Sequence, residues 1–482
     1  MHCVYFARLG EGRTRVFRAT VRAMNKALIT VGAVAVSCMY FVAACSAQTA
    51  ATTPGAGVDA GVDAGTEAGA PRSDAGATLA TSWYATGKPF ADRYCRSCHG
   101  GQGPGVGDFT RYENVAALAP AMLAAVTSGR MPPGASDPAC RDYANSDRRF
   151  VSAEGRASFA KWVADGTPKG EPNGEVAVAE LDETIANPDL VIKAPAAYAP
   201  TYSNPNEPGN EYRCFALRPG LTSNKYITAL APVLDKRAMV HHIVAYRMAP
   251  DHLPAAGKSY PEDGWSCIDM VNAGVNPTGD PRQSDGMIVA WAPGTGAFNF
   301  PPGTGLSLKS TDVVVLQIHY FASGRVAAGT KDQTGFAFKL VDSVPTPILI
   351  APVGKSGFTI PAGDPAYSLT GSFGPVALPL TIYGTMPHMH VLGTGYELSV
   401  RNVDASQNCV AKADRYEFAN QVTYLFKNPV VVPAGAKVDF RCTWDNSAAN
   451  SNQFFTPPVA ISYGERTDQE MCYAFTLIGL GN

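Results

Sequence analysis

The sequence predicts a multidomain protein in which a small all-α domain precedes a larger region of antiparallel β-structure. The chain has 482 residues, enough for roughly two to four domains. Its 47 Gly and 37 Pro residues exceed average usage and favour turns and short strands over long helices. Helical periodicity occurs within residues 81–172, and runs rich in β-branched and aromatic residues follow that region.

The composition argues against several classes of protein. Hydrophobic residues make up 46% of the chain and charged residues only 17%, which fits an exported globular protein and neither a disordered nor a fibrous one. Lys and Arg number 39 against 41 Asp and Glu, so the formal net charge is -2. Because the chain has no basic surplus to neutralise a phosphate backbone, we expect no nucleic-acid partner.

Residues 1–45 resemble a lipoprotein signal peptide. Basic residues are frequent in positions 1–26, and positions 27–44 are uncharged and mostly apolar. Such a stretch can also just span a bilayer, so a retained anchor is the alternative. The letters VAAC that end at Cys45 favour cleavage and acylation of that cysteine. We expect an exported, membrane-anchored lipoprotein that faces the periplasm or the cell surface, with Met1 or Met24 as its start.

A flexible linker and a helical domain follow the signal peptide. Residues 46–80 are rich in Ala, Gly, Thr and Asp and too poor in large apolar residues to fold. Residues 81–172 contain three helix-like stretches. The first leads into Tyr94, the second places Val115, Leu118, Met122 and Val126 on one face, and the third carries Phe159, Trp162 and Val163 before Gly166.

The motif CRSCH in this domain has the spacing of a c-type haem attachment site. Cys95 and Cys98 would bond covalently to the haem, and His99 would bind the iron. The alternatives are a redox CxxC, a disulfide or half of a zinc site. A zinc site would need a second Cys/His pair, and none follows within reach. The domain therefore resembles a small cytochrome c with one covalent haem c.

Met131 is the candidate for the second axial ligand of this haem. It lies in the Pro-rich loop RMPPG between the second and third helical stretches, so it is not a residue of an apolar helix face. His and Met ligation fills both axial positions and leaves no place for oxygen. We expect a module that transfers electrons, joined to the rest of the chain by a linker at residues 173–195.

Six histidines lie outside the leader and the haem motif. Five of them lie in strand-like runs, and the sixth, His252, matches no motif. His388 and His390 are two residues apart, so a strand directs both to the same face, which is the arrangement needed for one metal ion. His241 and His242 are adjacent and would point in opposite directions in a regular strand. Both can bind one ion only if the strand is twisted or bulged there, with His319 supplied by another strand.

From about residue 189 to the C-terminus, the sequence resembles the copper type II, ascorbate-dependent monooxygenases. The resemblance lies in six motifs in the order of that family. They are YRC at 212–214, VHH at 240–242, WAPG at 291–294, LQIHY at 316–320, HMH at 388–390 and DQEMC at 468–472. The family fold implies two antiparallel jelly-roll β-sandwich domains, which we place at residues 196–350 and 351–482.

The resemblance also implies two copper ions and their ligands. One ion, used for electron transfer, would be held by three histidines, and the other, which binds oxygen and is catalytic, by two histidines and a thioether. The first set is His241, His242 and His319, and the second is His388, His390 and Met471. Imidazole with thioether is a soft, neutral set that favours Cu(I), which argues for copper over the alternative of a zinc hydrolase.

The cysteines fit an oxidising compartment. Six remain when the leader, Cys45 and the haem motif are set aside, and an even number allows full pairing. The pair Cys442–Cys472 matches a disulfide of the family, and Cys214–Cys267 is the next choice. Cys140 and Cys409 are left over, and a bridge from the haem domain to the last domain would be unusual.

Two functions compete on this sequence. The first is a copper monooxygenase that hydroxylates a C–H bond of a small-molecule or peptide substrate with O₂. Its electrons would come from an external reductant through its own haem c. The alternative is a lipid-anchored copper and haem protein that carries electrons or metal and has no hydroxylase activity.

Overall fold

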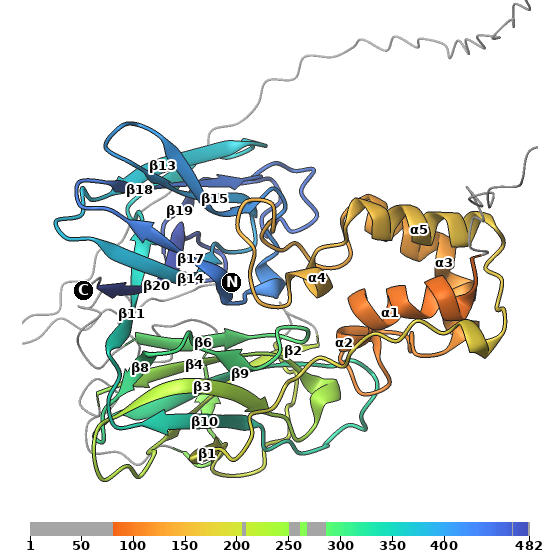
Figure 1. Cartoon of the computed structure of the whole chain (residues 1–482), viewed down its shortest axis with the longest axis horizontal. Helices are drawn as coiled ribbons and strands as arrows, with labels where there is room; N and C mark the ends of the chain where they lie inside the picture. The colour runs from red at the N-terminus through yellow and green to blue at the C-terminus, as the bar shows by residue number, and fades with distance from the viewer. Residues whose placement is uncertain (1–80, 205–208, 250–260, 268–285, 465, 481–482) are drawn as a thin grey trace, which may run out of the picture. The chain divides into compact units, whose positions relative to one another are not determined.

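Figure 1 presents a computed structural model of the protein, which describes residues 81–204, 209–249, 261–267, 286–464 and 466–480. The predicted signal peptide with Cys45, the linker at 46–80 and His252 lie outside these ranges. Within the described ranges, no helix combines the length and the apolar character needed to cross a membrane.

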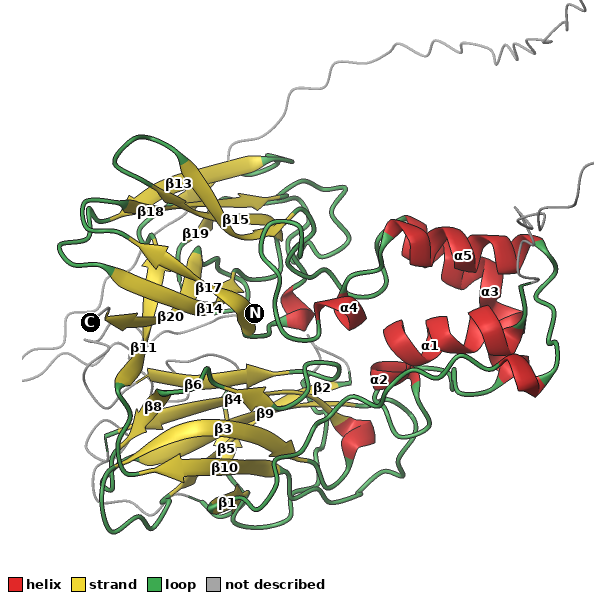
Figure 2. Cartoon of the chain, in the orientation of Figure 1, coloured by secondary structure: helices red, strands yellow, loops and turns green. Residues whose placement is uncertain are grey.

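The N-terminal part of the described chain is helical, as the red elements of Figure 2 show. Phe90, Phe159 and Trp162 form its core, with Phe90 stacked on Phe159 at a ring-centroid distance of 4.1 Å. Leu118 departs from the expected buried face, since it is 43% exposed and lines a cavity described below. The elements are η1 (Trp83–Gly87), α1 (Lys88–Tyr94), α2 (Arg96–His99), α3 (Tyr112–Thr127), α4 (Ser146–Arg149), α5 (Ala153–Ala164) and η2 (Pro172–Gly174).

The first β-sandwich packs two sheets around a core that includes Phe215, Leu230 and Leu316. One sheet has β1 (Leu190–Lys193), β10 (Gly335–Val341), β3 (Lys225–Val233) and β8 (Thr304–Leu308), with β7 (Phe298–Asn299) beside β3. The other has β5 (Trp265–Ser266), β2 (Asn210–Leu217), β9 (Val313–Phe321), β4 (Val240–Met248) and β6 (Gly286–Trp291). The short helix η3 (Arg237–Met239) leads into β4.

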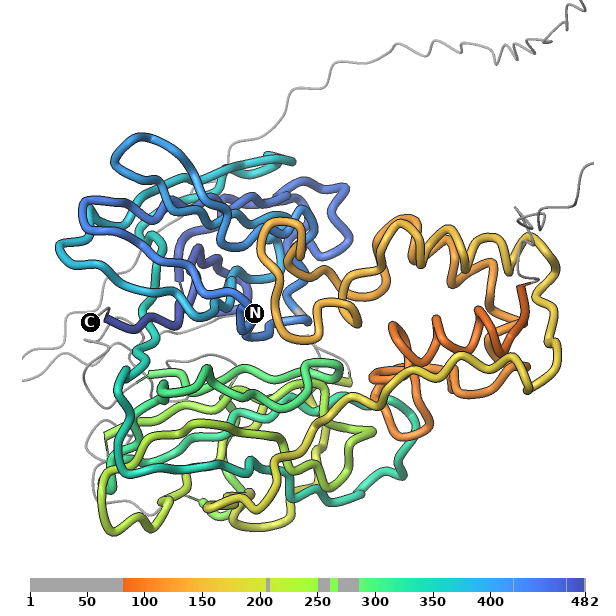
Figure 3. The backbone as a smooth tube through the Cα atoms, in the orientation of Figure 1, coloured from red at the N-terminus to blue at the C-terminus, as the bar shows by residue number. Residues whose placement is uncertain are grey.

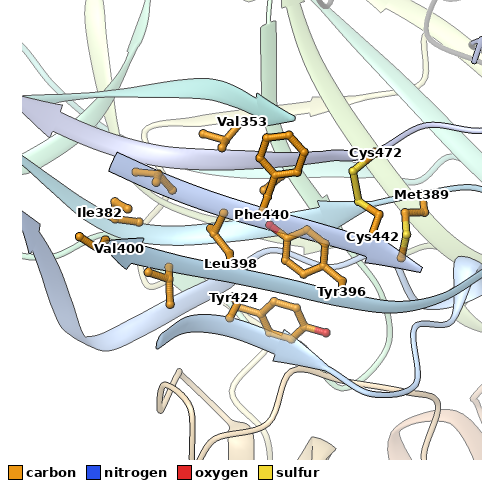
Figure 4. Close-up of a cluster of buried hydrophobic side chains, with 14 of the residues drawn as sticks. Val353, Ile382, Met389, Tyr396, Leu398, Val400, Tyr424, Phe440, Cys442 and Cys472 are labelled. Atoms are coloured by element: carbon orange, nitrogen blue, oxygen red, sulfur yellow. A yellow bond between two sulfur atoms is a disulfide. The ribbon is translucent and has the colours of Figure 1, made fainter. Parts of the chain in front are cut away.

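The second β-sandwich has the same plan, and Figure 4 shows Leu398, Tyr396 and Phe440 in its core. One side consists of β11 (Thr346–Gly354), β20 (Tyr473–Leu480), β14 (Leu380–His388) and β17 (Tyr424–Val432). The other consists of β13 (Tyr367–Phe373), β18 (Lys437–Trp444), β15 (Gly393–Arg401) and β16 (Gln407–Ala413). A small pair, β12 (Thr359–Ile360) with β19 (Ile461–Ser462), and the turn η5 (Phe418–Asn420) complete it.

One strand belongs to both sandwiches. Strand β11 pairs in parallel with β8 of the first and antiparallel with β20 of the second, so a single nine-stranded sheet runs through the two. The boundary that the sequence suggests, between residues 350 and 351, falls inside this strand. The other strand pairs of these sheets are antiparallel, so the parallel β11–β8 contact is an exception to the expected pattern.

Two segments of the N-terminal region join the sandwiches. The tube in Figure 3 leads from α5 to β1, so the predicted linker at 173–195 ends as a strand of the first sandwich. Residues before α4 reach the second sandwich, where Tyr143 is buried in the core and pairs with Phe426. A disulfide between Cys140 and Cys409 fixes this contact. The bridge that looked unusual from sequence therefore follows from a loop that packs on the last domain.

Candidate active site

Three histidines converge at one end of the first sandwich. The β4–β9 register pairs Val240 with Tyr320 and His242 with His319, so His241 is the extra residue of a β-bulge. The bulge removes the alternation that would send adjacent side chains to opposite faces. His241, His242 and His319 each place a ring nitrogen within 4.8 Å of the others. The bulge that the sequence required for a shared ion is present.

The Nδ1 atoms of these rings face one another. The Nδ1 of His242 lies 3.3 Å from the Nδ1 of His241 and 3.3 Å from that of His319. Two imidazole nitrogens bound to one ion at ~2.0 Å in tetrahedral geometry lie about 3.3 Å apart. The His319 Nε2–H donates to Asn210 Oδ1 at 2.8 Å, which leaves its Nδ1 lone pair free, and Tyr212 stacks on the ring at 4.1 Å. The donor set fits a metal ion.

Burial keeps all three rings neutral. It lowers the pKa of His241 to about 4, that of His242 to about 3, and that of His319 well below its usual range. Only His241 is partly exposed. A neutral imidazole offers a lone pair to a metal, so the cluster is poised to bind an ion near pH 7.

A second cluster lies in the other sandwich. His388 ends β14 and His390 follows it, with ring centroids 5.2 Å apart. The Nδ1–H of His388 donates to Gln421 Oε1 at 2.8 Å, and that of His390 donates to the Gln469 carbonyl at 2.9 Å. Both Nε2 atoms therefore carry the lone pair. Burial lowers the pKa of His388 to about 3 and that of His390 to about 4, so these rings are neutral as well.

A buried carboxylate holds the segments that carry this cluster. Glu470 accepts the backbone N–H groups of His390 and Leu392, each at 2.8 Å, and the indole N–H of Trp444 at 2.9 Å. Burial raises the pKa of Glu470 to about 7, and these donors act in the opposite direction. Glu470 therefore ties the segment after β14, which contains His390, to the segment that contains Met471.

The two clusters border one small cavity of about 40 Å³. His242 lines it from the first sandwich, and His388, His390 and Met471 line it from the second. The other described residues around it are uncharged, with aromatic, aliphatic, thioether, hydroxyl and amide side chains. They are Tyr212, Val244, Tyr246, Met287, Gln317, Met386, Phe418, Gln421, Thr467 and Phe475.

Both clusters lie in regions that match models of a known family. Residues 198–325 match the N-terminal domain of the copper type II ascorbate-dependent monooxygenases, and residues 354–477 match the C-terminal domain. Together the two matches cover just over half of the chain. The chain belongs to this family. It is thus a copper-dependent oxidoreductase that incorporates oxygen, and the three-histidine cluster is its copper-like site.

The CRSCH motif of this monooxygenase lies outside both matched regions, on α2 and the residue before it. Cys95 and Cys98 are free thiols, whereas the other six cysteines of the described chain form three disulfides. Burial raises the pKa of Cys95 to about 12, which disfavours the thiolate that redox CxxC sites and zinc sites use. The His99 Nδ1–H donates to the Val106 carbonyl at 2.7 Å, which leaves the lone pair on Nε2.

These residues surround a cavity of about 560 Å³, within the ~300–1,000 Å³ range of cofactor sites. Cys95, Cys98, His99 and Met131 all line it. Apolar side chains of α3 supply much of the remaining wall, and they include Leu118, Met122, Ala125 and Val126. The charged residues of the wall are all basic, namely Arg130, Arg148 and Arg149, which suits a ligand with carboxylates. Cavity size, wall chemistry and ligand atoms fit a haem.

The structure forms all three disulfides that the even cysteine count allows. Cys442 is bonded to Cys472, as Figure 4 shows, and Cys472 directly follows Met471 in the sequence. Cys214 on β2 is bonded to Cys267. The Cys267 carbonyl accepts a hydrogen bond from the side-chain amide of Gln317. The sequence analysis assigned no role to Asn210, Gln421 or Glu470. Asn210 and Gln421 meet their histidines only through strand register and loop packing, so no local signal could reveal them. Glu470 lies inside the DQEMC motif, which is the sequence signal that points to it.

Proposed function

We propose that the protein hydroxylates a C–H bond of a small-molecule or peptide substrate at two copper ions. One oxygen atom of O₂ enters the C–H bond and the other leaves as water, which requires two electrons and two protons from outside. The observation that carries the proposal is the small cavity lined by His242 on one side and by His388, His390 and Met471 on the other.

Copper at the two clusters would store one electron at each site and activate O₂ at the second. The first cluster offers three neutral imidazoles held by one bulged strand and its neighbour. The second offers the Nε2 atoms of His388 and His390 with the thioether of Met471, a soft set suited to Cu(I). Aromatic side chains of the cavity, such as Tyr246 and Phe475, pack around the second set and exclude water from the reacting C–H bond.

We also propose that the helical region binds one haem c. Support comes from the unpaired thiols of Cys95 and Cys98, the lone pair left on His99 Nε2 and the cavity that these residues share with Met131. With His99 and Met131 as axial ligands, the site transfers electrons and binds no oxygen. The haem is the donor that passes electrons from an external reductant to the copper sites.

The three disulfides indicate an extracytoplasmic protein, because such bonds persist in oxidising compartments. We propose that acylated Cys45 anchors the protein to a membrane. The support for this anchor is the sequence that ends at Cys45. Mass spectrometry of the exported N-terminus tests it, since a diacylated or triacylated cysteine is expected as the first residue.

Metal and haem content combined with oxygen consumption tests the proposed function. We expect two copper ions and one haem c per chain by elemental analysis and the pyridine haemochrome assay. With ascorbate and a panel of peptides and small apolar molecules, the protein should consume O₂, and His388→Ala should not. Copper and haem without oxygen consumption would favour an electron or metal carrier, and zinc in place of copper would contradict the proposal.

A further inference from the structure

The three-histidine cluster separates two cavities. On one side, His241 lines the cavity of about 560 Å³ that also contains Cys95, Cys98 and His99. On the other side, His242 lines the cavity of about 40 Å³ that contains the second cluster. Among the described residues, none of the three side chains of the second cluster lines the larger cavity. The haem cavity therefore meets the copper-like sites at one residue only.

The β-bulge at His241 produces this arrangement. It turns two adjacent imidazoles toward one centre, with their Nδ1 atoms 3.3 Å apart, while their backbones occupy successive positions on β4. His241 remains partly exposed beside Phe321, which lines the same cavity with a ring centroid 6.0 Å away. One ring thus presents Nδ1 to the cluster and another part of its surface to the haem cavity.

Two arginines hold the haem motif against the strands that carry the cluster. Arg237, four residues before His241, donates to the Ser97 carbonyl at 3.3 Å, and Glu183 holds its guanidinium. Arg325, which follows β9, donates to the Gly100 carbonyl at 2.7 Å. Ser97 lies inside the CRSCH motif, and Gly100 directly follows it. The haem motif is thereby fixed next to His241, where a flexible linker alone would leave it free to move.

We propose that electrons enter the copper pair at the first site, through His241, from a haem in the adjoining cavity. The inference rests on the proposed haem and copper sites. In each transfer one electron leaves the haem iron, which goes from Fe(II) to Fe(III), and reduces Cu(II) to Cu(I) at the first site. A one-electron donor such as ascorbate then reduces the haem again. Electron transfer slows steeply with distance, so His241, the proposed copper ligand that also lines the haem cavity, defines the path.

Laser-flash reduction of the haem tests this route in the full chain loaded with haem and Cu(II). A photoexcited flavin reduces the haem without oxygen or substrate, and the haem α-band then reports its reoxidation. We expect a first-order phase that is independent of protein concentration, matched by loss of the Cu(II) EPR signal. The phase should persist in His388→Ala, which lacks the second site, and be lost in His241→Ala.

A second pair of variants leaves both metal sites intact. The double variant Arg237→Ala, Arg325→Ala should slow the phase at least about tenfold at unchanged copper and haem content. Loss of one charged hydrogen bond is enough to lower the fraction of molecules with the haem motif docked beside His241 by about that factor. Arg218→Ala, at an exposed position, is the matched control and should leave the rate unchanged. In the parent protein, Cu(II) should also shorten the electron-spin relaxation time of the ferric haem, which requires no variant.

The outcomes separate this inference from the proposed function. A phase lost in His388→Ala and retained in His241→Ala would place electron entry at the second site and overturn the inference. The inference would also be overturned if the parent protein contained haem and two copper ions and consumed oxygen but showed no such phase. An unchanged rate in the double arginine variant would overturn it as well. Absence of haem or of oxygen turnover would instead overturn the proposed function.

Discussion

The two histidine clusters contain similar side chains but present different nitrogen atoms. In the first, the Nε2–H of His319 is bound to Asn210, and the Nδ1 atoms converge. In the second, the Nδ1–H groups of His388 and His390 are bound to Gln421 and to the Gln469 carbonyl, so the Nε2 atoms remain. The hydrogen-bond partner of an imidazole therefore decides which nitrogen lone pair is available to a metal.

The clusters also differ in what surrounds them. Among the described residues, the first cluster lines both cavities, through His241 and His242, whereas the second lines the small cavity and not the large one. A site between two cavities suits relay of electrons, and a site with two imidazoles and a thioether in the small cavity suits oxygen chemistry. Variants that change one cluster and spare the other test this division of roles.

Removal of the thioether should abolish catalysis. We expect Met471→Leu to lower oxygen consumption by more than about 100-fold, because the change removes a proposed copper ligand, whereas loss of a supporting residue costs roughly 10–100-fold. The first site should keep its copper. Met389→Leu is the matched control, since Met389 is also buried and lies between the two histidines. Both swaps conserve volume and cost less than about 1.5 kcal/mol of stability.

The assignment of Met471 would be wrong if Met471→Leu kept full oxygen consumption and two copper ions per chain. Equal loss of activity in Met389→Leu would point instead to a packing effect shared by both methionines. Circular dichroism and the thermal midpoint establish that each variant is folded, so the comparison rests on copper content and turnover.

Each supporting amide should affect its own site. Asn210→Leu should weaken copper binding at the first site and Gln421→Met at the second, each by roughly 10–100-fold, because the imidazole loses the acceptor that fixes its tautomer. Asn210→Asp and Gln421→Glu retain an acceptor oxygen and should bind copper nearly as the parent does. Competition with a Cu(I) chelator measures both affinities. Weakening of the distant site by either variant would contradict the separation of the clusters.

The disulfides should distinguish stability from copper binding. By loop length, replacing either Cys214–Cys267 or Cys442–Cys472 with Ala pairs costs on the order of 3–4 kcal/mol, with the longer 53-residue loop costing slightly more than the 30-residue one. Only the second pair should change copper affinity at the second site, since Cys472 adjoins Met471. Denaturant unfolding and chelator competition measure the two effects. A larger copper loss from the Cys214–Cys267 pair would oppose this expectation.

Much of the site was accessible from sequence because its residues lie in local patterns. The need for a bulge at His241 follows from strand periodicity alone. The expectation that one strand carries both His388 and His390 was wrong in detail, because β14 ends at His388 and His390 lies in the segment after it. The contact between Cys140 and Cys409 could not be predicted, since it depends on a loop that packs Tyr143 into a domain distant in sequence. The predicted domain boundary fell inside β11 for the same reason. The two partners of this strand, β8 and β20, lie far apart in the chain, so the sequence around β11 does not show that it pairs with both.

The smallest expected effect concerns acid. Protonated imidazole cannot bind copper, so the copper affinity begins to fall once the pH drops below the pKa of the metal-free ring. Burial lowers this pKa to about 4 for His241 and to about 3 for His388, below the usual ~6.5 of histidine. Lowering the pH from 7 to about 5.5 should therefore leave both copper ions bound, whereas an exposed three-histidine site would begin to release its ion. Dialysis followed by elemental analysis measures the retention.

Below about pH 4 the two sites should separate, because their ligands differ in number of titratable groups. Release of copper from the first site is opposed by three imidazoles that take up protons, and from the second by two, since the Met471 thioether does not titrate. The logarithm of the copper affinity should then fall by up to about three per pH unit at the first site and two at the second. EPR of Cu(II) with circular dichroism at each pH distinguishes release from unfolding. Equal slopes in folded protein would mean that Met471 is replaced by a titratable ligand or that His241 does not bind.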